Sequence, residues 1–241
     1  MEDSRVKIAV ASGKGGTGKT TISTNLAYLA ARAGRSVAYA DCDVLFFPEL
    51  CHSCGGCQLA CPEAAISEVP RPIGRVRWGS SGPLRFVDGL LNVGEAMSPP
   101  AIRAVKDCLP QDAELVFLDC PPGTSCPTIE SVRGADFVLL VTEPTPFGRH
   151  DLDLAVQMTR VLNLPLGVVV NRADIGDRQV WDDCHRQQIE ILAEIPEDRE
   201  VARAYSQGRL AAVDVPRLAI ILSGLLEALE TSHFAADSAV A

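Results

Sequence analysis

Short apolar runs alternate along the chain with stretches in which apolar residues recur every three to four positions. The runs, such as residues 137–141, contain no alternating polar residues, which is typical of parallel strands buried on both faces. We predict strands over residues 7–12, 37–40, 85–87, 115–118, 137–141, 166–170 and 191–195. We predict helices over residues 19–33, 99–109, 128–133, 149–162, 177–188, 199–207 and 216–229. This alternation predicts an α/β fold, a doubly wound and mostly parallel sheet with helices on both faces.

Residues 45–83 interrupt the alternation. The stretch contains four cysteines, many prolines and glycines, and little periodicity. We therefore predict one large domain built from residues 1–44 and 84–231, a small cysteine-rich insert over residues 45–83, and a flexible tail over residues 232–241. The length of 241 residues is enough for one such domain with a small insert.

The composition narrows the class of protein. A net charge of −9 argues against general affinity for nucleic acid or anionic lipid, so we expect neither as a partner. The N-terminus lacks the apolar core of a signal peptide, and no apolar run is long enough to span a membrane. We expect a cytoplasmic protein with reduced thiols. Nine cysteines in such a chain indicate metal binding or redox chemistry more than disulfides.

A glycine-rich loop lies between the first predicted strand and the first predicted helix. Its sequence matches the phosphate-binding pattern G-x-x-x-x-G-K-[ST] at every fixed position. Glycines leave backbone N–H groups free to face phosphate oxygens, and the helix N-terminus adds its positive dipole end. We expect Lys19 to bridge the β- and γ-phosphates and the Thr20 hydroxyl to bind Mg²⁺. The predicted nucleotide-binding loop comprises Gly13, Lys14, Gly15, Gly16, Thr17, Gly18, Lys19, Thr20 and Thr21.

Carboxylates follow two of the predicted strands, where the carboxyl ends of parallel strands face a ligand crevice. Asp119 ends an apolar strand, and we expect it to contact Mg²⁺ through water. The proline- and glycine-containing residues 120–124 suit a loop that senses the γ-phosphate. Asp43 is the candidate for orienting the attacking water, with Asp41 nearer to Mg²⁺ or structural. The alternative is that one of this pair only caps a turn.

The cysteine-rich stretch contains a C-x₂-C-x₂-C-x₃-C-P run formed by Cys51, Cys54, Cys57 and Cys61. This is the spacing of bacterial ferredoxins and predicts a [4Fe–4S] cluster. A zinc site is the alternative, although zinc usually uses two separated cysteine pairs. In two-cluster ferredoxins the fourth cysteine of a run binds the other cluster, and only one run is present here. The chain has therefore lost a second run or lacks a segment near residues 44–45.

The phosphate loop, with lysines at both Lys14 and Lys19, resembles the deviant Walker A motif of the MinD/ParA/Mrp ATPases, relatives of the nitrogenase iron protein. Asp-Cys-Asp at 41–43 and Asp-Cys-Pro-Pro-Gly-Thr at 119–124 resemble the two switch segments of that family. The resemblance covers nearly the whole chain, including residues 142–148 and 170–172. It implies a P-loop ATPase that forms a homodimer around two nucleotides, with Lys14 reaching the partner's phosphates. Asp43, Lys14 and Lys19 would then be the catalytic residues.

The resemblance also bears on the nucleotide base. An asparagine in the position of Asn171 contacts adenine in that family, so we expect Asn171 and Arg172 to bind the nucleotide. The tetrapeptide Asn171-Arg172-Ala173-Asp174 also resembles the Asn-Lys-x-Asp guanine reader of GTPases, with arginine replacing lysine. Asp174 could then accept hydrogen bonds from guanine. The two-lysine loop favours ATP over GTP.

These features lead to one hypothesis and two alternatives. The hypothesis is a dimeric Mg-ATP-hydrolysing switch with a ferredoxin-like insert, which couples turnover to electron transfer or cluster handling with an unknown redox or cluster-acceptor protein. One alternative is a MinD/ParA-like positioning ATPase with a structural insert, and the other is a cluster carrier that binds nucleotide without turnover. MinD-type proteins reach membranes through a basic C-terminal helix, whereas residues 216–229 contain only Arg217 as a basic residue. We therefore expect no membrane partner.

Overall fold

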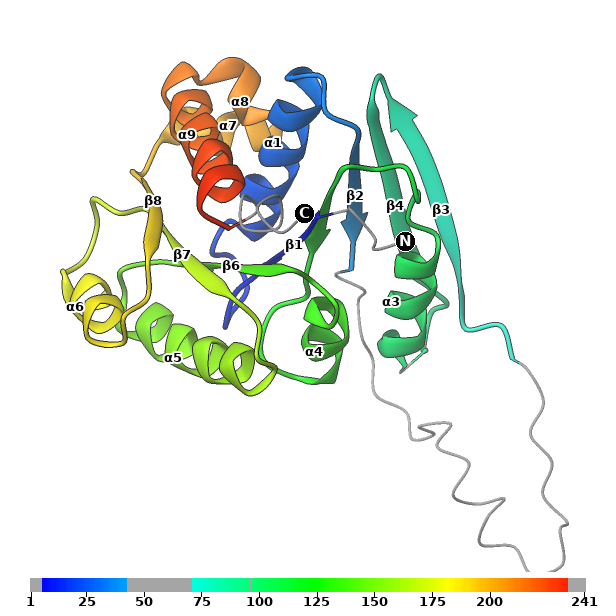
Figure 1. The fold of residues 1–241 in the computed structure, drawn as a ribbon, viewed down its shortest axis with the longest axis horizontal. Helices are drawn as coiled ribbons and strands as arrows, with labels where there is room; N and C mark the ends of the chain where they lie inside the picture. Colours follow the sequence, from blue (N-terminus) through cyan, green and yellow to red (C-terminus); the bar gives the residue numbers. More distant parts are fainter. Residues whose placement is uncertain (1–5, 43–70, 96, 234–241) are drawn as a thin grey trace, which may run out of the picture.

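The computed structural model describes residues 6–42, 71–95 and 97–233, which form an eight-stranded sheet flanked by helices (Figure 1). The strand order is β3-β4-β2-β5-β1-β6-β7-β8, and every neighbouring pair is parallel except β3 and β4. The strands are β1 (Val6–Ala11), β2 (Val37–Asp41), β3 (Gly74–Ser81), β4 (Leu84–Leu91), β5 (Leu115–Asp119), β6 (Phe137–Thr142), β7 (Leu166–Asn171) and β8 (Ile191–Ile195). The predicted doubly wound, mostly parallel sheet is confirmed.

Two layers of helices cover the two faces of this sheet (Figure 1). One layer contains α1 (Lys19–Arg32), α7 (Arg199–Ser206), α8 (Ala211–Asp214) and α9 (Pro216–His233). The other contains α3 (Ser98–Asp107), α4 (Cys126–Val132), α5 (Pro146–Val161) and α6 (Gln179–Arg186). The short α8 is an element that the sequence pattern did not predict, and α9 continues into the residues predicted to form a tail.

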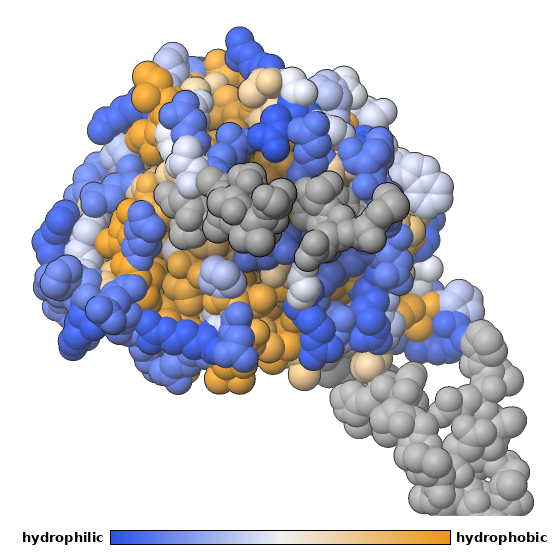
Figure 2. All heavy atoms as spheres, viewed as in Figure 1, coloured by the Kyte–Doolittle hydropathy of each residue, from blue (hydrophilic) through white to orange (hydrophobic). Residues whose placement is uncertain are grey.

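The central strands contribute side chains to both cores, which explains why their sequences show no alternation. On β6, Val138 and Leu140 pack towards α5, whereas Phe137 and Leu139 pack towards α1 and α9. All four are fully buried. Figure 2 shows one face of the molecule, on which hydrophilic residues predominate at the left and right edges and apolar residues are visible nearer the middle.

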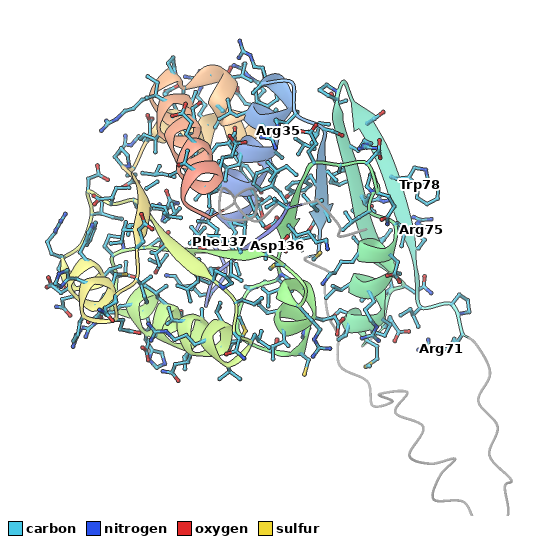
Figure 3. The ribbon with its side chains drawn as sticks, in the orientation of Figure 1. Arg35, Arg71, Arg75, Trp78, Asp136 and Phe137 are labelled. Carbon is cyan, nitrogen blue, oxygen red and sulfur yellow. The ribbon has the colours of Figure 1, made fainter. Side chains whose placement is uncertain are left out.

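The edge strand β3 corrects the predicted insert, which was drawn over residues 45–83. Residues 74–81 instead pair antiparallel with β4, from Gly74 opposite Leu91 to Ser81 opposite Leu84. Gly82 closes this hairpin with φ 59°, a left-handed conformation that favours glycine. The strand escaped prediction because its side chains are mostly exposed, and Trp78 projects from the edge with 76% of its surface accessible (Figure 3). The rest of the predicted insert, up to residue 70, lies outside the described residues.

The burial of the central strands makes a prediction about stability. Phe117 on β5 is fully buried between the sheet and the helix layer of α1. We expect Phe117→Ala to lower the free energy of unfolding by about 3–5 kcal/mol, because the cavity left behind adds to the lost burial. The matched control is Phe147→Ala, whose ring is 79% exposed and whose loss we expect to change stability by less than ~0.5 kcal/mol. Urea denaturation followed by circular dichroism measures both, and equal losses would contradict the assignment.

Candidate nucleotide site

The phosphate loop joins β1 to α1 and has the backbone that its glycines allow. Gly16 and Gly18 have φ values of 80° and 94°, and Gly18 is the N-cap of α1. A Cβ atom at Gly18 would lie 2.5 Å from Asn171 Nδ2, and one at Gly13 would lie 2.1 Å from the carbonyl oxygen of Asp151. The loop is therefore held closely between β7 on one side and α5 on the other, and both positions need glycine.

A pocket of about 450 Å³ opens beside this loop and has the size of a small-molecule site. Its walls come from the loop, the first turn of α1, the segments that follow β7 and β8, and helices α7 and α9. The lining residues include Gly15, Gly16, Gly18, Lys19, Thr20, Thr21, Asn171, Arg172, Pro196, Glu197 and Tyr205. The structure thus brings most of the predicted nucleotide-binding residues to one cavity. The contribution of the segment after β8 was not predicted.

Asp119 is the buried anion at the base of the loop. It is 1% exposed, and its Oδ2 accepts hydrogen bonds from Thr20 Oγ1 at 2.7 Å and from the Tyr39 hydroxyl at 3.1 Å. Asp41 on β2 lies directly opposite Asp119 in the parallel register. A carboxylate and a hydroxyl are the hard oxygen ligands that Mg²⁺ prefers, so these residues fit a magnesium ion.

Tyr39 is a supporting residue that sequence analysis missed. Burial, and after it the charge of Asp119, raise the pKa of the Tyr39 phenol well above its ordinary value. The phenol therefore stays protonated and donates its hydrogen bond to Asp119. This contact joins β2 to β5 and fixes the orientation of the carboxylate beneath Thr20.

The two lysines of the loop lie in different surroundings. Lys19 begins α1, is 6% exposed and lines the pocket. Lys14 is more exposed, and its Nζ lies 3.3 Å from Oε2 of Glu143, just beyond the end of β6. Glu143 also pairs with Arg172, whose Nη1 lies 3.1 Å from Oε1. Glu143 lies within residues 142–148, which resemble the family, but its pattern in the sequence predicts no role for it.

Asn171 and Asp174 have structural contacts that separate their roles. The Asn171 side chain donates from Nδ2 to the carbonyl oxygen of Thr17 at 2.9 Å, which ties β7 to the phosphate loop. Asp174 Oδ1 accepts from the backbone N–H of Glu197 at 2.6 Å and so holds the segment after β8. Asn171 lines the pocket, whereas Asp174 is absent from the described lining. This arrangement gives Asp174 a structural contact, and its part in base recognition stays a prediction.

Two buried cysteines directly follow Asp41 and Asp119 in the chain. Cys42 and Cys120, which follow β2 and β5, are fully buried. Burial raises the pKa of Cys42 to about 12 and that of Cys120 well above its ordinary range. Both thiols belong to the apolar core on the face of the sheet that α3, α4, α5 and α6 cover. Within residues 6–42, 71–95 and 97–233, no group of three histidines, cysteines or acids could hold a metal ion.

Five predicted site residues lie outside the described part of the chain. They are Asp43, the candidate for orienting water, and the cysteines Cys51, Cys54, Cys57 and Cys61. Their roles remain predictions from the sequence. The catalytic assignment of Lys14 and Lys19 and the magnesium assignment of Asp41 are likewise predictions, although their positions beside the loop are consistent with them.

This combination of fold and loop defines a P-loop nucleotide-binding protein. A sequence model described as the CobQ/CobB/MinD/ParA nucleotide binding domain matches residues 8–211, and the chain belongs to this family. No helix in the described part of the chain is both long and apolar enough to cross a membrane.

Relatives of two kinds are similar to this chain. An uncharacterised ATP-binding protein of Methanocaldococcus jannaschii is 27% identical over 216 residues, which cover 88% of this chain and 81% of that protein. An iron–sulfur cluster carrier protein of Deinococcus radiodurans is 30% identical over 239 residues, which cover 87% of this chain and 64% of the carrier.

Solved structures share the fold at lower identity. The cell division ATPase MinD of Pyrococcus furiosus superposes with a TM-score of 0.67 at 23% identity, over 93% of this chain and 98% of MinD. The ATP complex of McdA(D38A) from Cyanothece gives a TM-score of 0.68 at 18% identity, over 93% and 96% of the two chains.

The contact of Asp174 makes a prediction about base selection. We expect Asp174→Asn to leave the ratio of GTP to ATP dissociation constants within about twofold of the wild type, because the amide oxygen can still accept from Glu197. Competition against a fluorescent ADP analogue measures both constants. Asn171→Ala is the contrasting variant, and we expect it to weaken binding of both nucleotides by loosening the loop. A site that reads guanine through Asp174 would instead change the ratio by about 10⁴-fold.

Proposed function

We propose that this protein is a dimeric switch that binds and hydrolyses Mg-ATP, carries a [4Fe–4S] insert, and couples turnover to electron transfer or cluster handling. The observation that carries the nucleotide part is the 2.7 Å hydrogen bond between Thr20 and the buried Asp119 beside the phosphate loop. It joins the hydroxyl and the carboxylate that Mg-dependent P-loop hydrolysis requires. Membership of a nucleotide-binding family supports the same reading.

Different residues of the site would bind the phosphates, the Mg²⁺ ion, the attacking water and the base. Backbone N–H groups of residues 13–20 hold the phosphates, and the Lys19 ammonium neutralises the β- and γ-oxygens from its buried position. Thr20 and Asp119 would hold Mg²⁺, with Asp41 beside them. Bound Mg²⁺ supplies charge neutralisation for the leaving phosphate. Asp43 orients the attacking water, and Asn171 and Arg172 support the base.

The dimer part of the proposal rests on Lys14. Its ammonium lies at the strand end of the loop and is the more exposed of the two loop lysines. A lysine there can reach phosphates bound by a second copy of the chain and stabilise the charge that develops on them. Nucleotide binding would therefore favour two chains facing each other across two nucleotides, and hydrolysis would release them.

The cluster part of the proposal rests on the cysteine run. The spacing of Cys51, Cys54, Cys57 and Cys61 is that of bacterial ferredoxins. Several relatives of the chain are named iron–sulfur cluster carrier proteins, and they support a role in cluster handling. The same names favour a second candidate function, a carrier that binds nucleotide without turnover. The partner is a redox protein or a cluster acceptor.

The hydrolytic role predicts the behaviour of two variants. We expect Lys19→Ala and Asp43→Ala each to lower the ATPase kcat by at least about 100-fold, because each removes a group that acts on the reacting phosphate or water. The control is Asp112→Ala, an exposed carboxylate paired with Arg85, whose loss we expect to leave turnover unchanged. Phosphate release with and without a reductant measures turnover. Unchanged kcat in both site variants would refute the assignment of hydrolysis to this site, and a wild type without turnover would favour the carrier.

If the cysteine run binds a cluster, the iron content of the protein depends on the cysteines of that run. Protein purified without oxygen should contain iron and acid-labile sulfide, and Cys54→Ser should lower both several-fold by removing one thiolate ligand. Cys108→Ser is the matched control, because Cys108 is an exposed free thiol after α3 and should leave the iron unchanged. Bound zinc with no sulfide would overturn the cluster and indicate a zinc site.

A further inference from the structure

Glu143 is a buried carboxylate that holds two cations of the nucleotide site. Its side chain is 8% exposed, whereas those of Lys14 and Arg172 are 29% and 48% exposed. Oε2 faces Lys14 Nζ at 3.3 Å and Oε1 faces Arg172 Nη1 at 3.1 Å. Burying a carboxylate is unfavourable unless it is paired, so Glu143 depends on these partners. Lys14 has a flexible side chain with access to water, so its ammonium can leave the carboxylate.

The turn that carries Glu143 is fixed by its own contacts. Thr142 Oγ1 donates to the Gly148 carbonyl at 3.0 Å, and Gly148 N donates to Thr145 Oγ1 at 3.0 Å. A Cβ atom at Gly148 would lie 2.4 Å from the Glu143 carbonyl oxygen. The start of α5 is thus packed directly against the backbone of Glu143. The carboxylate is a fixed anchor beside a loop whose Lys14 side chain can turn away.

We propose that Glu143 is a positioning residue that holds Lys14 in the monomer and so sets the nucleotide concentration at which the dimer forms. The inference rests on the proposed dimeric switch and adds its regulation. An ammonium paired with Glu143 cannot also serve the partner's phosphates, so closing the dimer requires this ion pair to separate. The separation is tolerated because Arg172 stays with Glu143, and the buried carboxylate keeps one partner.

The backbone conformation of Arg172 supports the inference that Arg172 stays with Glu143 when Lys14 leaves. Arg172 has φ 53°, a left-handed conformation that is uncommon for residues other than glycine, asparagine and aspartate. Such strain persists only where surrounding contacts determine it. The contact to Glu143 is one of these, and it joins the end of β6 to the end of β7. Glu143 therefore has one permanent structural partner and one exchangeable partner.

The test compares Glu143→Gln with the wild-type chain, since the amide keeps the shape and removes the charge. Sedimentation velocity would measure the dimer fraction during titration with Mg-AMPPNP. We expect the half-maximal nucleotide concentration to fall about tenfold in the variant, because closing no longer separates an ion pair. In nucleotide-free protein, an amine-acylating reagent followed by mass spectrometry should modify Lys14 several-fold faster in the variant, with Lys7 as the internal reference.

Glu130→Gln is the matched control, because this half-buried carboxylate of α4 also pairs with two arginines, Arg103 and Arg133, and does not line the nucleotide pocket. We expect slow acylation of Lys14 and no fall in the nucleotide threshold. An equal fall in Glu130→Gln would assign the effect to a general loss of negative charge and overturn the proposal. A wild type that dimerises while Glu143→Gln changes neither threshold nor acylation would overturn it and leave the dimeric switch standing. A wild type that stays monomeric at saturating nucleotide would overturn both.

Discussion

The hydrogen bonds to one buried carboxylate, Asp119, tie the sheet to the phosphate loop. Thr20 donates to it from the first turn of α1, and Tyr39 donates from the neighbouring strand β2. A charged oxygen that is 1% exposed is tolerated only with such donors, so β2, β5 and α1 must all be in place before the site exists. The order of the sheet is therefore a condition for binding. The carboxylate then presents a fixed negative charge at the place that the proposed function gives to Mg²⁺.

The loop is held by a carboxylate on each side. β1, which leads into the loop, lies between β5 and β6 in the sheet. Asp119 at the end of β5 contacts the helix end of the loop through Thr20, and Glu143 just after β6 contacts the strand end through Lys14. Two anions beside a site for anionic phosphates would repel the ligand unless cations intervene. Lys14 neutralises Glu143, and in the proposed function Mg²⁺ would neutralise Asp119.

The sequence predicted what depends on local pattern and missed what depends on contacts across the fold. The buried strands and the loop were predictable, because their signals lie within a few consecutive residues. β3 was missed because an edge strand covered on one side needs few apolar residues. Its sequence, which includes Arg75 and the exposed Trp78, has the pattern of a surface segment. Glu143 was missed because its partner Lys14 is 129 residues away. Tyr39 was missed for the same reason, since only the register of β2 against β5 brings it to Asp119.

The place where the cysteine-rich segment joins the fold argues for coupling between the two. β2 ends at Asp41, opposite Asp119, and the next residue, Cys42, is fully buried with its N–H bonded to the Asp119 carbonyl at 2.8 Å. The chain resumes at Arg71 and enters β3, whose first residue, Gly74, pairs with Leu91 at the carboxyl end of β4. Both ends of the segment are thus attached at the carboxyl edge of the sheet, where the nucleotide pocket opens. A displacement of Asp41 on loss of phosphate would be transmitted through one peptide bond to Cys42 and then to Asp43. Covalent continuity therefore connects the nucleotide site to the cysteine run.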